Sequence, residues 1–198
     1  DYWIPIRPAT DAALWLGITK LMMDNKQYDE AFVKQFTDFP LLVRTDNLKR
    51  LRAQDVFPDY KPGLTADGAS MKVQNLTAEQ YAKLSDFVVW DTKENKPVAL
   101  SRDDVGAHFA EKGIDPALEI RSKIKLVSGE EVEVASLWSL YQDHLKDYDL
   151  DTVHDITQAP KELITQLTND IATMKPVAIH QGEGINHWFH ATEMNRAA

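Results

Sequence analysis

The sequence feature that most constrains the fold is a strand–turn–helix pattern near its C-terminal end. The apolar run Val177 to Ile179 is typical of a buried strand, and it is followed by two glycines, Gly182 and Gly184. The segment 185–190 is rich in histidine and aromatic side chains, and we predict that it is helical. A strand, a glycine turn and a helix place backbone N–H groups and polar side chains at one edge of a sheet, where α/β proteins bind nucleotides and cofactors.

A second loop of this kind opens the chain at residues 6–11. Thr10 is the predicted N-cap of a helix, since its hydroxyl can accept a hydrogen bond from a free N–H of the first turn. Asp11 then lies near the positive end of that helix. Apolar residues at helical spacing predict an amphipathic helix over residues 11–24, namely Leu14, Ile18, Leu21 and Met22. The sequence therefore predicts one ligand-binding loop toward each end of the chain.

The segments between the two loops predict further helices and strands. Helical patterns cover residues 29–36, 136–148 and 160–174, with a basic turn of helix at 47–52. Strand patterns cover residues 40–45 and two hairpins, 87–90 with 97–100 and 123–127 with 131–134. The predicted fold class is therefore α/β, with strand–loop–helix units at both ends and a small β-hairpin insertion in the middle.

Three segments follow from this pattern. Residues 1–54 form an α/β segment that contains the first loop. Residues 55–134 begin with a stretch rich in proline, glycine and polar residues, and we predict an extended surface excursion followed by the hairpin insertion. Residues 135–198 form an α/β segment that contains the second loop.

Composition excludes several classes of function. The formal net charge of −9 argues against non-specific nucleic-acid binding, which needs a basic surface. The absence of cysteine excludes disulfides, cysteine zinc sites, thiolate nucleophiles and iron–sulfur ligation within this chain. No apolar stretch approaches the roughly 20 residues of a membrane span. Neither end carries a start or cap signal, so we expect an internal piece of a larger protein.

The three histidines His180, His187 and His190 have three interpretations. On a helix, His187 and His190 would share one face. A direct zinc or iron site is one interpretation, although the spacing is not His-Glu-x-x-His and Glu183 precedes the predicted helix. A second is a helix core packed with the neighbouring aromatic rings. The third is a polar pocket wall from which a histidine donates to an anion or to a cofactor.

The glycines and the acidic residue of the two loops are weak signals by themselves. The segment around Gly182 and Gly184 lacks the Rossmann pattern, and a tight turn explains it, although two glycines allow close approach of a ligand. A helix cap explains Thr10 and Asp11. An aspartate in such a loop can also accept hydrogen bonds from the N1–H and N2–H₂ groups of guanine. The residues alone indicate an α/β protein that binds ligands at both loops.

Three segments resemble one family. Trp3 to Leu14 resembles the PGTDAAL segment of the molybdopterin oxidoreductases related to dimethyl sulfoxide reductase. Residues 182–190, GEGINHWFH, and residues 38–46, DFPLLVRTD, are similar to segments of the type II branch of that family. This branch includes the catalytic subunits of respiratory nitrate reductase and nitrite oxidoreductase. One departure is Ala9, where glycine is usual.

The resemblance implies a partial molybdopterin-oxidoreductase fold that holds molybdenum bis(molybdopterin guanine dinucleotide). By match to the first motif, a guanine nucleotide would be lined by Ala9, Thr10 and Asp11. By match to the second motif, the pterin side near the metal would be lined by Gly182, Glu183, Gly184, Asn186 and His187. The implied candidates for substrate contact and catalysis are Asn186, His187 and His190. The family's aspartate ligand to molybdenum and its 4Fe–4S motif lie upstream of this region, so this segment alone is not expected to be catalytic.

The implied reaction is oxygen-atom transfer between nitrite and nitrate. The implied partners are an iron–sulfur β subunit and, as a further candidate, a membrane-anchoring or haem γ subunit. The enzyme would associate with a membrane through these subunits, on a face that the sequence does not assign, with no direct membrane insertion and no nucleic-acid partner. Two alternatives stay open. One is another type II enzyme acting on chlorate, perchlorate, selenate or a hydrocarbon, and the other is a non-catalytic, degenerate binding module.

Overall fold

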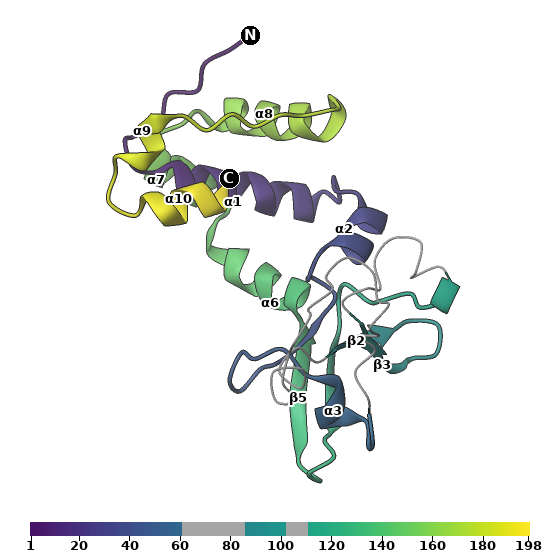
Figure 1. The fold of residues 1–198 in the computed structure, drawn as a ribbon. Helices are drawn as coiled ribbons and strands as arrows, with labels where there is room; N and C mark the ends of the chain where they lie inside the picture. Colours follow the sequence, from purple (N-terminus) through teal and green to yellow (C-terminus); the bar gives the residue numbers. More distant parts are fainter. Residues whose placement is uncertain (61–85, 102–110) are drawn as a thin grey trace, which may run out of the picture. The chain divides into compact units, whose positions relative to one another are not determined.

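The computed structural model describes residues 1–60, 86–101 and 111–198. The chain forms two compact units. Unit 1 comprises Asp1–Tyr28 and Gln142–Ala198, and unit 2 comprises Asp29–Tyr141. In the described residues unit 1 is helical and unit 2 contains the β-strands (Figure 1). Both predicted ligand-binding loops belong to unit 1, although more than 150 residues separate them in the sequence.

Unit 1 is built around its first helix. Its helices are α1 (Asp11–Asp24), the 3-10 turn η1 (Leu145–Asp147), α7 (Leu150–Thr157), α8 (Lys161–Thr173), α9 (Glu183–Asn186) and α10 (Ala191–Ala197). Helix α1 packs against α7, α8 and α10. The shared core contains Leu14, Ile18, Val153, Ala159 and Ile164, and burial of each larger side chain contributes about 1.5–3 kcal/mol. Segments from both ends of the sequence therefore stabilise one core.

Helices α1 and α7 meet at a glycine. A Cβ atom placed on Gly17 would lie 2.5 Å from the Cγ2 atom of Val153, which is fully buried. A contact that short forces one helix to move, because a packed interior has no free volume to absorb a methyl group. Gly17 therefore permits the close approach of the two helices.

We expect Gly17→Ala to destabilise unit 1 by about 1–3 kcal/mol, the usual cost of overpacking a core. Hydrogen exchange of the α1 and α7 amides measures this change as a lower opening free energy. The double variant Gly17→Ala/Val153→Ala removes the methyl groups that clash, so its loss should be smaller than the sum of the two single losses. Strictly additive losses would show that the two residues do not compete for the same space.

Unit 2 contains two antiparallel sheets. Strands β1 (Leu42–Arg44), β5 (Glu131–Ser136) and β4 (Arg121–Lys125) pair in the order β1-β5-β4, and β2 (Phe87–Asp91) pairs with β3 (Lys96–Leu100). Its described helices are α2 (Glu30–Phe36), α3 (Ala53–Val56) and α6 (Leu137–His144), of which α6 extends across the boundary between the units. Burial alternates along β5 with a period of two, with Val132 and Val134 buried and Glu131 and Glu133 exposed. One face of this sheet is therefore core and the other is solvated.

Most predicted elements are present. The mixed helix and strand content is confirmed, the helix over residues 11–24 has the predicted bounds, and both hairpins form. Residues 47–52 are not a turn of helix, so that prediction is wrong. Leu48 has φ +56°, and the chain returns alongside β1 through a bridge between Val43 and Arg50. Most of the predicted excursion, residues 61–85, lies outside the described residues.

The predicted buried strand at Val177 to Ile179 is wrong. These residues belong to no strand, and the side chains of Val177 and Ile179 are 44% and 47% exposed. A strand needs neighbours for its backbone N–H and C=O groups. Both sheets of the described residues lie in unit 2, so neither supplies a neighbour to this segment.

Helix α7 was not predicted from the sequence. Its N-cap is Asp149, whose carboxylate accepts the N–H of Thr152 at 2.7 Å. This N–H holds the pKa of Asp149 below its ordinary value of 3.8. Asp149 therefore starts a helix. This role was not recognised in the sequence because Asp149 lies in a run of acidic surface residues.

The cap makes α7 sensitive to acid. The folded pKa of Asp149 is lowered, so its contribution is complete above the unfolded pKa and is lost as the pH falls below about 4. We expect faster hydrogen exchange of the α7 amides in that range, relative to the rest of unit 1. Asp149→Asn keeps a capping side chain without the titration, so its α7 exchange should lose this extra pH dependence. Equal pH dependence in both proteins would contradict the assignment.

Among the described residues, no helix combines the length and the apolar character needed to cross a membrane.

Candidate functional site

The first loop is held by three features of its backbone. The Arg7 N–H donates to the carbonyl oxygen of Thr157 at 2.7 Å. The Thr10 hydroxyl donates to the Arg7 carbonyl oxygen at 2.6 Å. Between these contacts, Ala9 has φ +63°, in the left-handed region. The predicted role of the Thr10 hydroxyl as an acceptor for the helix start is wrong, because the hydroxyl donates within the loop and accepts no N–H group of the first turn.

Ala9 occupies the position where the resembling family usually has glycine, and its conformation gives a reason. A Cβ atom in the left-handed region costs about 1–2 kcal/mol, whereas glycine has no such cost. We expect Ala9→Gly to raise the opening free energy of the loop by about 1 kcal/mol, measured by hydrogen exchange of the amides of residues 7–12. Ala12→Gly, within α1, is the matched control and should lower it by a similar amount. Faster exchange in Ala9→Gly would contradict the account.

Asp11 starts α1 and leaves its carboxylate available. The side chain is partly exposed, in the first turn of a 14-residue helix. Within the part of the chain that the structure describes, the Asp11 carboxylate takes part in no hydrogen bond or ion pair. Its two oxygens can therefore accept two donors from a ligand, while the positive helix end stabilises the charge.

The second loop contains a shorter helix than its sequence predicts. Helix α9 contains only Glu183–Asn186, and residues 187–190 form a turn before α10. His190 has φ +68°, which ends any continuous right-handed helix. The prediction that His187 and His190 share one helix face is therefore wrong.

Contacts within the second loop tie it to α10. The Asn195 side-chain amide donates to the Oδ1 atom of Asn186 at 2.9 Å. The ring of His190 lies edge-on to Phe189, with 4.3 Å between centroids, and its Nδ1 atom is 3.9 Å from the Glu193 carboxylate. Among the described residues, His187 has no such contact, so its ring is available to a ligand.

The second loop is open to its surroundings. A Cβ atom placed on Gly182 or Gly184 would meet no atom within 4 Å. Glu183, Asn186 and His187 are also exposed.

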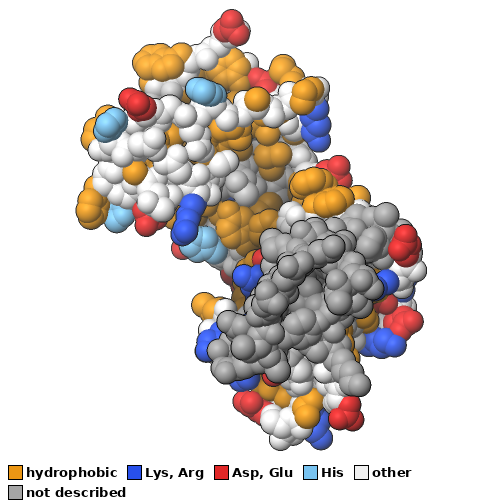
Figure 2. All heavy atoms as spheres, viewed as in Figure 1, with side chains coloured by type: hydrophobic (Ala, Val, Ile, Leu, Met, Phe, Trp, Pro, Cys, Tyr) orange, Lys and Arg blue, Asp and Glu red, His pale blue; other side chains and the backbone are white. Residues whose placement is uncertain are grey.

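In Figure 2, histidine and hydrophobic side chains lie at the visible surface of unit 1. Its large exposed apolar residues are Tyr2, Trp3, Met174, Val177, Ile179, Trp188 and Phe189.

The two loops lead into helices that pack on each other. The first loop enters α1, the second enters α10, and α10, which contains the buried Met194, packs against α1 (Figure 1). The structure thus brings the two loops into one unit. No hydrogen bond or ion pair of the described residues joins them directly.

A direct histidine metal site receives no support. Among the described residues, no group of three or more His, Cys, Asp or Glu side chains is arranged to hold a metal ion. This includes His180, His187 and His190. The interpretation of these histidines as a packed helix core also fails, because all three are exposed. The third interpretation, a polar wall from which a histidine donates to a ligand, remains and stays a prediction.

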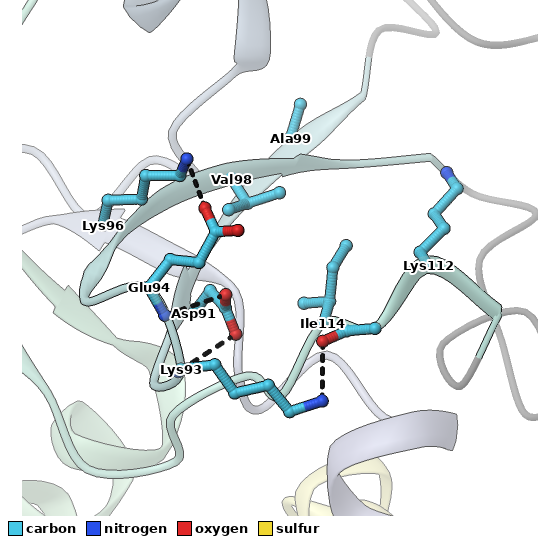
Figure 3. Close-up of a pocket in the computed structure, with 9 residues that line it drawn as sticks. Asp91, Lys93, Glu94, Lys96, Val98, Ala99, Lys112 and Ile114 are labelled. Atoms are coloured by element: carbon cyan, nitrogen blue, oxygen red, sulfur yellow. Dashed lines mark hydrogen bonds and ion pairs between the residues drawn. The ribbon is translucent and has the colours of Figure 1, made fainter.

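Unit 2 contains a separate hollow of about 390 Å³ beside β2 and β3. Asp91 is nearly buried there and accepts the backbone N–H groups of Lys93 and Glu94 (Figure 3). Lys96 pairs with Glu94, and the Lys93 ammonium donates to the Gly113 carbonyl oxygen at 2.7 Å. These charges are engaged with one another, so we assign no ligand to this hollow.

Sequence reasoning missed the residues that support the first loop. The most direct support is the end of α7, where Thr157 accepts the Arg7 N–H and His154 Nδ1 contacts the Ala159 carbonyl oxygen at 2.7 Å. A sequence signal existed, because Asp149 followed by Thr152 is a plausible helix start. The pairing between residues 150 positions apart had no such signal.

Comparison with known proteins gives whole-chain matches. No protein-family model matches the chain. The respiratory nitrate reductase subunit alpha of Haloferax mediterranei is 31% identical over 100% of this chain and 19% of its own length. The chain belongs to the type II branch of the dimethyl sulfoxide reductase family. The perchlorate reductase subunit alpha of Dechloromonas aromatica is 29% identical over 100% of the chain, and the chlorate reductase subunit alpha of Ideonella dechloratans is 26% identical over 99%.

The chain spans about a fifth of the length of these type II relatives, 19% to 21%. Each relative is an alpha subunit by name. The chain therefore matches one segment of each of these alpha subunits.

Proposed function

We propose that this chain is a cofactor-binding segment of the catalytic subunit of a molybdenum oxidoreductase that interconverts nitrite and nitrate. The observation that carries the proposal is the likeness of the whole chain to a respiratory nitrate reductase subunit alpha. The geometry of the two loops supports it, because both loops present exposed or partly exposed polar side chains on one unit.

The residues of the first loop fit a guanine nucleotide. Asp11 offers a carboxylate without a partner among the described residues, and the N1–H and N2–H₂ groups of guanine are two adjacent donors that such a carboxylate accepts. Ala9 and Thr10 shape the backbone that leads to it. This fit accords with a molybdenum bis(molybdopterin guanine dinucleotide) cofactor.

The residues of the second loop fit the pterin side of that cofactor. Gly182 and Gly184 leave their backbone accessible, since no atom lies within 4 Å of either Cβ position. Glu183, Asn186 and His187 add donors and acceptors at the same exposed surface.

The molybdenum group would supply the oxygen-atom transfer and the two-electron exchange that accompanies it, and the protein would supply binding and orientation. His187 and Asn186 would orient the oxyanion, since an imidazole N–H and an amide NH₂ both donate hydrogen bonds to its oxygens. His190 would stand beside them, held by Phe189 and Glu193. An iron–sulfur partner subunit, and membrane association through partner subunits, belong to the same proposal.

Substrate choice is tested by steady-state kinetics of the purified full-length complex with nitrate, nitrite, chlorate and perchlorate. We expect the highest kcat/KM for the nitrate–nitrite couple. A higher value for perchlorate or chlorate would overturn the proposed substrate. That outcome would favour the second candidate, an oxyanion reductase of the perchlorate or chlorate type, which the similar identity to those subunits supports.

A further inference from the structure

We propose that Thr157, the last residue of α7, is a positioning residue that holds the first loop in the conformation that binds the cofactor. This inference rests on the proposed function, because the shape of the loop matters for binding only if the loop has a ligand. It adds to the proposed binding residues a supporting residue that lies about 150 positions from the loop in the sequence and does not contact the ligand.

A chain of hydrogen bonds connects α7 to the loop. The carbonyl groups in the last turn of a helix lack helical partners and need others. The Thr157 carbonyl oxygen has the Arg7 N–H at 2.7 Å as its partner. The Arg7 carbonyl oxygen in turn accepts the Thr10 hydroxyl at 2.6 Å. The end of α7 is thereby connected to the residue that precedes Asp11.

The Thr157 side chain determines where its own carbonyl points. The side chain is fully buried, and its hydroxyl donates to the Val153 carbonyl oxygen at 2.7 Å. The Thr157 hydroxyl oxygen itself accepts the N–H of Ala159 at 3.1 Å. Gln158, between them, has φ +62° and turns the chain away from the helix. The hydroxyl thus bonds to the residues before and after the turn, and it fixes the orientation of the Thr157 carbonyl group that accepts the Arg7 N–H.

The loop needs this external support. Ala9 is held in the left-handed region, and a non-glycine residue stays there only when its surroundings restrain it. The restraints include the Arg7 contact with Thr157 and the Thr10 contact with Arg7, beside the packing of Ile6 on the core of unit 1. Release of the first would let the loop relax and move the Asp11 carboxylate.

The test uses the full-length subunit in its complex with three variants. Thr157→Val keeps the side-chain shape and removes the hydroxyl, while Thr157→Ser restores the hydroxyl. Thr168→Val is the matched control, because Thr168 is equally buried in unit 1 and its hydroxyl also donates to the carbonyl four residues earlier, on Ile164 at 2.9 Å. Two quantities are measured: hydrogen exchange of residues 6–11 in the cofactor-free protein, and guanine nucleotide released per chain from the loaded protein.

We expect Thr157→Val to speed exchange of the loop and to lower nucleotide occupancy at limiting cofactor fivefold to tenfold, about the factor that one buried hydrogen bond contributes. Thr157→Ser should restore both quantities, and Thr168→Val should change neither.

Three results would overturn the proposal, and the first two are distinct from a failure of the proposed function. Loop exchange that rises no more in Thr157→Val than in Thr168→Val would show that the contact does not hold the loop. Faster loop exchange with full occupancy, while Asp11→Ala loses nucleotide, would show that the loop tolerates the movement. Full occupancy in both Thr157→Val and Asp11→Ala would instead reject the loop as the nucleotide site, and with it the role of Thr157.

Discussion

His187→Ala in the full-length enzyme is expected to lower kcat roughly a hundredfold, within the range that a positioned proton donor contributes. It should leave the molybdenum and nucleotide content close to that of the unsubstituted protein. The reason is the position of the side chain: it is exposed in the second loop, and among the described residues no contact engages it. Its removal therefore costs little folding energy and removes a hydrogen-bond donor from the proposed substrate side.

The control is His180→Ala, an equally exposed histidine of unit 1 that precedes the glycine turn. Its kcat should be unchanged. Steady-state kinetics and elemental analysis, made on the same samples, distinguish a role of His187 in substrate contact from a structural role. Equal losses of kcat and of molybdenum in His187→Ala would point to a structural role and contradict the assignment.

Asp11→Ala is expected to lower the cofactor content of the full-length protein tenfold or more at limiting cofactor, since a bidentate contact contributes roughly 1–3 kcal/mol. The carboxylate is otherwise unpaired within the described residues, so its loss should not destabilise unit 1 through a broken contact. Guanine nucleotide and molybdenum are both measured per chain. Asp11→Asn, which replaces one acceptor oxygen by a donor, should retain less cofactor than the unsubstituted protein.

Asp24→Ala is the matched control for Asp11→Ala. Asp24 lies at the other end of α1, is exposed, and pairs with Lys20 at 2.7 Å, a surface pair that contributes little. Its cofactor content should be unchanged. If Asp11→Ala also kept its full cofactor, the carboxylate would have no role in binding the nucleotide.

The elements that depend on local pattern could be predicted from the sequence. The apolar spacing from Leu14 to Met22 specifies α1, and Thr10 and Asp11 mark its start. The alternation in Glu131 to Val134 specifies β5 together with its turn. In each case the pattern lies within the element itself, although the side chains of α1 pack against the distant helices α7 and α8.

The features that depend on distant neighbours could not be predicted. The apolar run at Val177 to Ile179 has the composition of a buried strand, but period and composition cannot supply a neighbouring strand. The left-handed residue His190 interrupts a segment whose composition favours a helix. The Thr10 hydroxyl donates to the Arg7 carbonyl oxygen, and the Arg7 N–H donates to Thr157 of α7, which lies 150 positions away in the sequence.

The candidate site divides in the same way. The family motifs identify the two loops, and the structure brings both into unit 1. The motifs carry no information about Thr157, because its role depends on where its backbone carbonyl points.

The central claim is that this segment belongs to a molybdenum enzyme, and the most direct test is elemental analysis of the purified native complex that contains it. The account predicts about one molybdenum per full-length chain, as expected for a protein-bound molybdenum cofactor. A carefully handled, folded complex without molybdenum would contradict the account and would favour a degenerate binding module with the same fold.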